Sequence, residues 1–222
     1  MTGPGFWNWD WVGRNTDVIR EQVLEHLSLT GLAVGIGLVI AFPLAVVAYR
    51  HPRLYPPLAW VTGLLYTIPS LAALALLYPL LGLTTLNAVV VLSSYTLLIL
   101  LRNTVTGLRG VPADVKEAAR GMGYTDRQLL WKVEVPLALP AIVAGLRIAT
   151  VTTIGLVTVT ALIGQGGLGF LMVAGFRRLF PRIAILVGIG LSVALAVAAD
   201  GGWLWAQRML APWARRARER TA

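Results

Sequence analysis

The sequence contains no cysteine, only two histidines and few charged residues for its length. The absence of cysteine excludes a disulfide framework, a thiolate metal site and a cysteine nucleophile. His26 and His51 are too few for a histidine-rich metal site. Charged residues form 13% of the chain, whereas soluble domains carry about 25%. We find no paired carboxylates, metal ligands or nucleophile–base set, so nothing in the sequence favours an enzyme.

The chain consists largely of long apolar runs, which a soluble protein of normal surface polarity would not contain. Hydrophobic residues form 57% of the 222 residues. Most runs approach the ~20 residues that a helix needs to cross ~30 Å of hydrocarbon. Because the apolar residues are continuous rather than alternating, we predict helices, and so an all-α integral membrane protein with about five transmembrane helices. The five apolar segments are 27–48, 58–81, 86–101, 137–163 and 183–205.

Basic residues are concentrated in alternate connections between these segments. The positive-inside rule therefore places the long central loop and the C-terminus in the cytoplasm and the N-terminus outside. Arg177, Arg178 and Arg182 fall on the opposite side and are an exception to the rule. The basic residues of the predicted cytoplasmic side are Arg50, Arg53, Arg102, Arg109, Lys116, Arg120, Arg127, Lys132, Arg208, Arg215, Arg216, Arg218 and Arg220.

The net charge of +9 follows from the same distribution. A strongly basic chain is also typical of nucleic-acid binding. Here, however, the charge is spread over loops, where it favours anionic lipid headgroups. We expect membrane lipid, and no nucleic acid, to contact these loops.

Residues 1–26 are predicted to form an external N-terminal segment. No basic region precedes the first apolar residues, so a cleaved signal peptide is not expected. Trp7, Trp9 and Trp11 are clustered as at a membrane interface, with disorder as the alternative. Residues 15–26 are predicted to form a short amphipathic helix on the outer interface. Its apolar face comprises Val18, Ile19, Val23 and Leu24. The transmembrane domain then covers 27–208, followed by a basic tail over 209–222.

The central loop, residues 111–136, begins with a predicted short helix. Pro112 suits the first helical position, and Asp114 lies in the first turn, where a carboxylate meets the positive end of the helix. Gly121 and Gly123 are predicted to end this helix. Thr125 and Gln128 form a capping-box pattern that starts a second helix, and Pro136 marks its approximate end.

Small residues on the first helix offer a surface that another protein can approach closely. Ala118 and Ala119 leave a patch without bulk, and Glu117 lies beside it as a charged group. Such a pair of short helices at a membrane face suits contact with a partner protein. From spacing alone, an ordinary amphipathic loop helix at the headgroups remains an alternative.

This loop resembles the EAA loop of ABC importer permeases. The family pattern is Glu-Ala-Ala, three residues, Gly, nine residues and then Ile-x-Leu-Pro, and the spacing here matches in full. Both aliphatic positions are valine, a mild departure. The matching residues are Glu117, Ala118, Ala119, Gly123, Val133, Val135 and Pro136. The resemblance implies that these residues, with Asp126, couple the chain to a cytoplasmic ATPase.

Further segments resemble permeases that import glycine betaine, choline and related osmoprotectants. They are Tyr66–Ala72, Leu101–Thr104, Gly107-Leu108, Ala144–Arg147, Ile163–Gly169 and Asp200. The resemblance implies a complex in a bacterial cytoplasmic membrane, with a second permease subunit, identical or paralogous, two ATPases and an external substrate-binding protein. ATP and Mg would bind the ATPases, and no cofactor is expected in this chain. Because the chain ends at Ala222, no fused binding domain is expected at its C-terminus.

The leading hypothesis is uptake of an osmoprotectant such as glycine betaine, choline or carnitine. One alternative keeps the permease but changes the cargo to another small amine, an amino acid or a thione. A second alternative, from a different class, is an ion-coupled secondary transporter, which would lack the EAA loop and need no ATPase.

Polar side chains within the apolar segments are candidates for the transport pathway, because polar groups facing lipid are costly. Aromatic faces suit a quaternary ammonium group, which favours Tyr66 and Tyr95. The alternative is that the hydroxyl groups bond to their own helix or pack helices together. The candidates are Tyr66, Ser70, Ser93, Ser94, Tyr95, Thr152, Thr153, Thr158 and Thr160, of which Tyr66, Ser70, Tyr95, Thr153 and Thr160 are preferred.

Three further features need an explanation. Arg147 and Asp200 are charges inside spans, and hence functional candidates, although a structural role is favoured over substrate contact for both. A pair between them is possible, but the sequence does not place the two together. The stretch Gly164–Gly169 superficially resembles a phosphate-binding loop but lacks its Lys-Ser/Thr ending. We predict a tight external turn or a re-entrant loop there.

Overall fold

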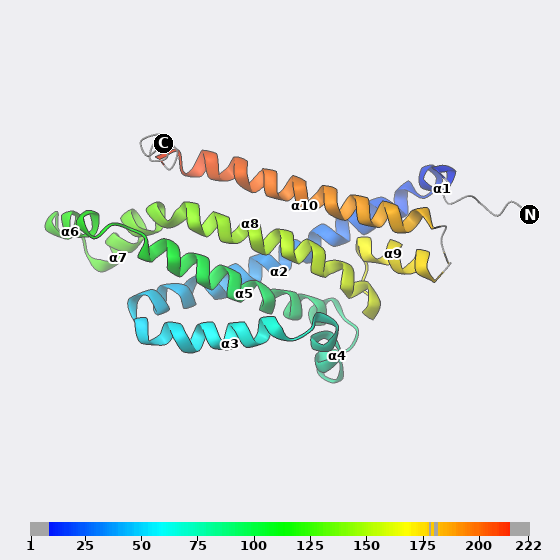
Figure 1. Cartoon of the computed structure of the whole chain (residues 1–222), viewed down its shortest axis with the longest axis horizontal. Coiled ribbons are helices and arrows are strands. Elements are labelled where there is room, and N and C mark those ends of the chain that lie inside the picture. The colour runs from blue at the N-terminus through cyan, green and yellow to red at the C-terminus, as the bar shows by residue number, and fades with distance from the viewer. Residues whose placement is uncertain (1–8, 178, 180–181, 214–222) are drawn as a thin grey trace, which may run out of the picture.

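The computed structural model describes residues 9–177, 179 and 182–213 of the chain, and all of its regular secondary structure is helical (Figure 1). Trp7, Arg178 and the arginines of the predicted tail from Arg215 onward lie outside the described residues. The α-helices are α1 (Trp9–Arg14), α2 (Thr16–Arg50), α3 (Tyr55–Thr67), α4 (Ser70–Leu81), α5 (Thr85–Arg109), α6 (Ala113–Gly121), α7 (Asp126–Leu129), α8 (Val135–Thr160), α9 (Leu168–Phe176) and α10 (Ile183–Leu210). Short 3-10 turns cover Pro52–Leu54 and Ala161–Ile163, and a π-helical turn covers Leu130–Glu134.

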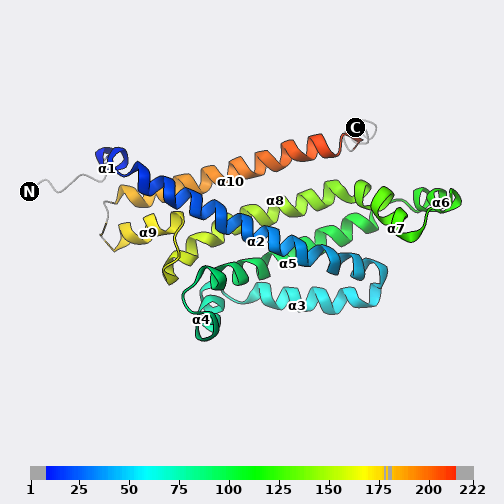
Figure 2. The ribbon, with the colours of Figure 1, turned by 180° about the vertical axis from the view of Figure 1, so that it is seen from behind.

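The long helices form an elongated bundle with two distinct ends. Four helical stretches are long and apolar enough to cross a membrane, and the bent pair α3–α4 would make a fifth span. This agrees with the predicted fold class. Figures 1 and 2 show α6, α7, the α2–α3 turn and the end of α10 at one end of the bundle, which we call the coupling end. α1, α4 and α9 lie at the other end. The first connection, the central loop and Arg208 at the end of α10, which were predicted to share one side, therefore do lie together.

The first span is longer than predicted. Residues 15–26 were expected to form a separate helix, but α2 runs without a break over 35 residues from Thr16 to Arg50. No proline or glycine lies between Thr16 and Thr30 to interrupt it. Val18, Ile19 and Val23 pack against a cluster that includes Trp11 and residues of α9 and α10. Most of the predicted apolar face is thus covered by protein, and the prediction of a separate interfacial helix is wrong.

The second span is broken in the middle. α3 and α4 meet at an angle of 95°, where a single helix over 58–81 was predicted. Pro69 has no backbone N–H and forces the preceding residue out of the helical region. Ile68 accordingly has φ −66° and ψ 126°. The Tyr95 hydroxyl on α5 donates a hydrogen bond to the Ile68 carbonyl over 2.6 Å and so satisfies a backbone group that the break leaves free.

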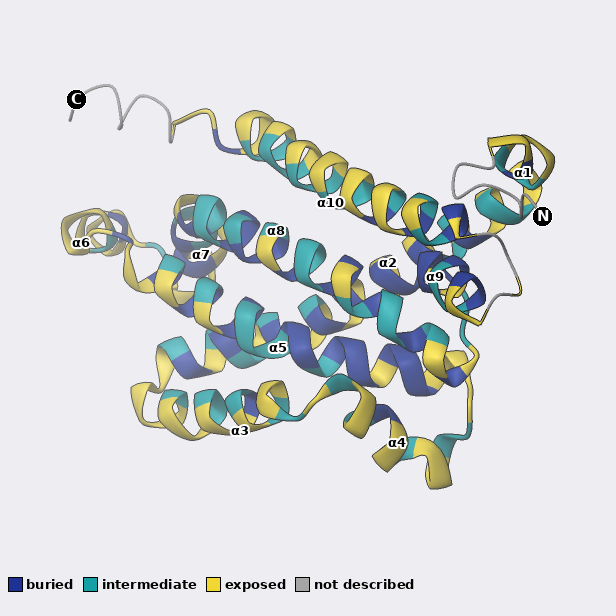
Figure 3. Cartoon of the chain, turned by 45° about the vertical axis from the view of Figure 1, so that its right-hand side comes forward, coloured by how far each residue is buried: buried dark blue, intermediate teal, exposed yellow. Residues whose placement is uncertain are grey.

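α5 lies at the centre of the bundle, between α2 and α8. Small residues allow the close approach, as is usual between membrane helices. Ala33, Ala41 and Ala45 of α2 are fully buried or nearly so. A Cβ on Gly145 of α8 would lie 2.7 Å from Asn103 Cβ of α5. In Figure 3, α5 carries much buried surface, whereas α10 and α6 are largely exposed.

α9 is a helix that no apolar segment predicted. At 9 residues it is too short to span a membrane. It packs between α8 and α10, and Leu168 and Leu171 are fully buried. Gly169 makes this packing possible, because a Cβ there would lie 2.1 Å from the Thr158 carbonyl oxygen of α8.

Replacing Gly169 by alanine should therefore loosen the contact between α9 and α8. The carbonyl of Thr158 is backbone and cannot turn aside, so we expect a loss of about 1–3 kcal/mol in the free energy of unfolding. Thermal unfolding of the detergent-solubilised protein measures this loss of stability. The control is Gly155→Ala on α8, where the new methyl group meets open space. Equal stability of the two variants would contradict the packing.

Candidate functional site

The coupling end carries two short helices that project from the bundle (Figure 1). α6 begins directly after Pro112 and ends in a tight turn at Gly123, which has φ 84°. The Tyr124 N–H donates to the Ala119 carbonyl over 3.2 Å, and the Gly123 N–H donates to the Arg120 carbonyl over 2.9 Å. These two bonds form a Schellman motif, which needs a left-handed residue at the position of Gly123. The predicted helix end at Gly123 is confirmed.

The second short helix starts as predicted but does not end as predicted. The Thr125 hydroxyl oxygen accepts from the Gln128 N–H, and the Gln128 side chain accepts from the Thr125 N–H, so the capping box is present. Pro136 was expected to mark a helix end, yet the chain continues through the π-helical turn Leu130–Glu134 into α8. Because a π turn shifts the hydrogen-bond pattern by one residue, the missing N–H of Pro136 falls near the start of α8, where proline is tolerated.

The predicted coupling residues do not all face outward. Glu117, Ala118, Gly123 and Asp126 are exposed, whereas Ala119 is only 2% exposed and packs inside the chain. Val133 and Pro136 are half-buried at the base of α8. Val115, Met122 and Trp131 add exposed apolar surface at the same end. The surface open to a partner is therefore mixed. Exposed apolar side chains lie among exposed charged ones, which are Asp114, Glu117, Arg120, Asp126, Arg127 and Lys132.

A buried polar contact beneath α6 was not predicted. The Tyr49 hydroxyl, near the end of α2, donates a hydrogen bond to Glu134 Oε1 over 2.5 Å. Glu134 is 3% exposed and is the last residue of the π turn. Lys116 Nζ of α6 lies 3.2 Å from the same hydroxyl oxygen. The Tyr49 hydroxyl thus accepts a hydrogen bond from Lys116 and donates one to Glu134. The signal available in the sequence was a carboxylate at residue 134 inside an otherwise apolar helix start.

The predicted pathway residues divide into two groups. The hydroxyl groups of Ser94, Thr158 and Thr160 donate to carbonyls of their own helices, at Val91, Gly155 and Val157. Tyr95, Thr153 and Thr160 are buried within the chain. Tyr66 is 40% exposed, and its ring lies edge-on to Tyr95 at 5.9 Å between centroids. Ser70 follows at the start of α4 and is half-buried, so Tyr66 and Ser70 are the two of the five preferred candidates that are not buried, and both lie at the α3–α4 break. Ser94, Thr152 and Thr158 are also half-buried, on α5 and α8.

The glycine-rich stretch 164–169 forms a turn that leads into α9. The Gly166 N–H donates to Glu25 Oε1 over 3.0 Å, and the Leu168 N–H donates to His26 Nδ1 over 3.2 Å. His26 Nε2 in turn lies 3.0 Å from the Ile154 carbonyl oxygen. With one ring nitrogen accepting and the other donating, His26 is a neutral imidazole. The N–H groups of Gly166 and Leu168 are thus bonded within the chain, and the stretch forms a turn, which was one of the two structures predicted for it.

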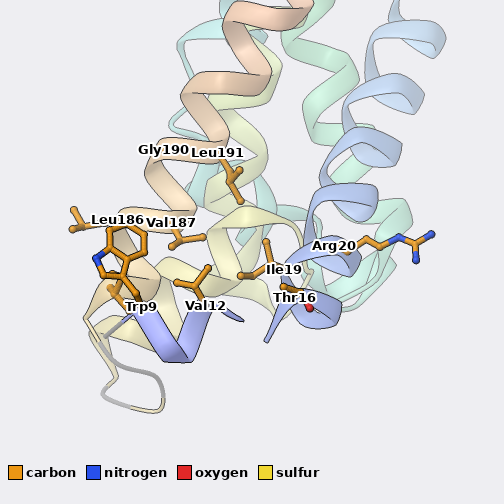
Figure 4. Close-up of a pocket in the computed structure, with 10 residues that line it drawn as sticks. Trp9, Val12, Thr16, Ile19, Arg20, Leu186, Val187, Gly190 and Leu191 are labelled. Carbon is orange, nitrogen blue, oxygen red and sulfur yellow. The ribbon is translucent and has the colours of Figure 1, made fainter. Parts of the chain in front are cut away.

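An apolar groove of about 520 Å³ lies near this turn, between α1, the start of α2 and α10 (Figure 4). Val12, Ile19, Leu186 and Val187 point into it. Arg20 also borders the groove, but its side chain extends away from it in Figure 4. The lining offers hardly any polar group with which to orient a charged cargo.

The two charges inside the spans meet. Arg147 Nε and Nη2 donate to the two carboxylate oxygens of Asp200, each over 2.9 Å, and so join α8 to α10. Their side chains are 28% and 38% exposed. Trp203 Nε1 donates to Thr150 Oγ1 over 3.0 Å one turn away and adds a second polar contact between the same helices. The structure therefore contains the pair that the sequence left as a possibility.

Comparison with known families gives a match over residues 33–214, to the binding-protein-dependent transport system inner membrane component family. The chain belongs to this family. It is a multi-pass membrane component of a transport system of that kind, and the alternative of an ion-coupled secondary transporter is set aside.

Similar sequences and structures agree with the family. The osmoprotectant import permease protein OsmW of Salmonella typhimurium is 39% identical, over 86% of this chain and 89% of that protein. The choline transport system permease protein OpuBB of Bacillus subtilis is 37% identical, over 89% and 91%. The carnitine transport permease protein OpuCD of Listeria monocytogenes is 36% identical, over 91% of each. A chain of the MetNI methionine ABC transporter shares the fold, with a TM-score of 0.79 at 24% identity over 89% of this chain and 98% of that chain.

The ion pair of this family member should act as a unit. Asp200→Leu leaves Arg147 without its partner in an apolar environment, and Arg147→Met does the same to Asp200. We expect each single variant to be less stable than the double variant, with a coupling free energy of about 0.5–3 kcal/mol in a double-mutant cycle. Thermal unfolding in detergent measures the stability of the wild type, the two single variants and the double variant. Additive losses would show that the pair contributes nothing beyond its separate side chains.

Proposed function

We propose that this chain is the membrane-spanning subunit of an importer for an osmoprotectant of the glycine betaine, choline and carnitine class. A separate cytoplasmic ATPase would drive it, and an external binding protein would deliver the cargo. The observation that carries the proposal is the pair of short helices projecting from one end of a bundle whose sequence is 36–39% identical to permeases named for such cargoes. Neither ATP nor Mg is expected to bind this chain.

Charge supports an orientation with the coupling end in the cytoplasm. Arg50, Arg109, Arg120 and Arg208 all lie at that end, where the positive-inside rule favours them. The end with α1 and α9 would then face the exterior and the binding protein. This proposal keeps the N-terminus outside and the C-terminus in the cytoplasm.

The exposed part of the coupling loop is our candidate for the ATPase contact. Glu117 and Ala118 lie on the outer surface of α6, and Met122 follows as an exposed apolar side chain. A projecting surface that combines exposed apolar and charged side chains suits contact with a partner, since burial of the apolar groups supplies affinity and the charges supply orientation. Ala119 and Val133 would act by holding α6 and α8 in place. Two permease chains, each contacting one ATPase, complete the proposed assembly.

For the cargo pathway we favour the surface of the α3–α4 break. Tyr66 presents part of its ring there, and Ser70 begins the next helix. A quaternary ammonium group is attracted to the face of an aromatic ring. In a complete importer a second permease subunit would face this surface and enclose the path.

Uptake by the reconstituted complex tests the proposal. The chain is assembled in proteoliposomes with its ATPase and binding protein, and uptake of labelled glycine betaine, choline and carnitine is measured with and without ATP. We expect ATP-dependent uptake of at least one of them. Uptake driven by an ion gradient without ATP, or uptake of methionine but of no quaternary amine, would contradict the proposal.

Gly123 provides a test of the coupling loop. A Cβ at this residue meets open space, but its φ of 84° is strained for other residues by about 1–2 kcal/mol. Gly123→Val should therefore change the direction of the chain after α6 and abolish ATP-dependent uptake while the protein stays in the membrane. Gly123→Asn should retain more activity because asparagine tolerates this conformation.

Gly121→Val is the matched control. Gly121 is helical and also has open space around it, so its replacement should leave uptake much closer to the wild type. Full uptake by Gly123→Val, measured at equal membrane levels, would remove the loop from the mechanism.

A further inference from the structure

The contact among Lys116, Tyr49 and Glu134 is a polar link between three elements at the coupling end. Lys116 belongs to α6, Tyr49 to α2 and Glu134 to the turn that starts α8. We propose that Tyr49 and Glu134 are positioning residues that transmit the movement of α6 to α2 and α8. This inference rests on the proposed function of the coupling loop and names the side chains through which the loop acts on the membrane helices.

Chain connectivity alone does not link α6 to α2. Tyr49 is 67 residues from Lys116 and 85 residues from Glu134 in the sequence. α6 is joined by short connections to α5 and α7, but α2 can follow it only through side-chain contacts. The hydroxyl of Tyr49 is suited to this role because it accepts from Lys116 and donates to Glu134 at the same time.

Burial makes the contact costly to break. Glu134 is 3% exposed, and a buried carboxyl group needs hydrogen-bond partners. A bond to a charged group is also stronger than one between neutral groups. When α6 moves, the arrangement that keeps Glu134 bonded is one in which Tyr49, and α2 with it, moves too.

A second contact holds the same end of α2. Arg50 Nη2 donates a hydrogen bond to the Asp126 carbonyl at the start of α7 over 2.8 Å. A cavity of about 440 Å³ lies between these contacts, with Arg50, Arg120 and Glu134 among its lining residues. The end of α2 is thus attached to the coupling loop at two points, with space beside them in which the side chains can rearrange.

The test compares Tyr49→Phe with Tyr55→Phe in the reconstituted complex. Tyr55 lies at the same end of the bundle, its ring faces Arg109, and its hydroxyl has no hydrogen bond to any described residue. The measured quantity is the amount of cargo transported per ATP hydrolysed. We expect Tyr49→Phe to lower this ratio about tenfold, as for the loss of one bond to a charged group. We expect Tyr55→Phe to stay within about twofold of the wild type.

Two further comparisons separate positioning from simple support of the fold. Lys116→Met keeps the aliphatic stem of a partly exposed side chain, so it should leave assembly intact while lowering the transport ratio less than Tyr49→Phe does. Glu134→Gln keeps an oxygen that can accept from Tyr49, and it should retain a higher ratio than Glu134→Leu. A purely structural role would change unfolding temperature and assembly without changing the ratio.

The outcomes distinguish this inference from the function on which it rests. Normal ratios for Tyr49→Phe and Lys116→Met, in a complex whose wild type shows ATP-driven uptake, overturn the inference and leave the proposed function standing. A wild-type complex without ATP-dependent uptake overturns the proposed function. If Tyr49→Phe assembles poorly, the test rests on Lys116→Met. A normal amount of cargo transported per ATP by Lys116→Met then overturns the proposed link from α6 to α2.

Discussion

Close contact between α5 and its two neighbours is the constraint on which the rest of the subunit depends. In lipid, apolar side chains gain little by leaving the solvent, so helices associate through tight packing and polar contacts. Ala41 on α2 and Gly107 and Gly145 at the α5–α8 contact remove the bulk that would keep the backbones apart. The resulting three-helix core positions α6 and α7 at one end and the turn before α9 at the other.

α2 connects the two ends of this core. Near its start, Glu25 and His26 hold the turn that leads into α9. Near its end, Tyr49 and Arg50 hold the coupling loop. α2 is one continuous helix between these two sets of contacts, with Pro43 inside it. This arrangement suits an importer in which events at the ATPase and at the binding protein must remain coordinated.

Local chemistry made parts of the coupling loop predictable. The Schellman turn at Gly123 and the capping box of Thr125 and Gln128 involve residues at most five apart, so the sequence pattern alone indicated them. The prediction of a helix end at Pro136 was wrong. The π turn before it places Pro136 in the first turn of α8, where a backbone N–H is not needed. The break at Ile68 and Pro69 was also missed, because average hydropathy does not register a change of direction within an apolar run.

By itself, the sequence determined the membrane-spanning helical class, the approximate spans and the ends of the two short helices at Gly123 and Thr125, because these follow from hydropathy and from contacts between near neighbours in the chain. It indicated that Arg147 and Asp200 needed an explanation, but only the tertiary structure brought α8 and α10 together and paired them. The same holds for Tyr49 with Glu134 and for His26 with the turn before α9. Side chains separated by 50 residues or more meet only after the helices have packed, and which faces pack is decided by the volumes of many residues at once.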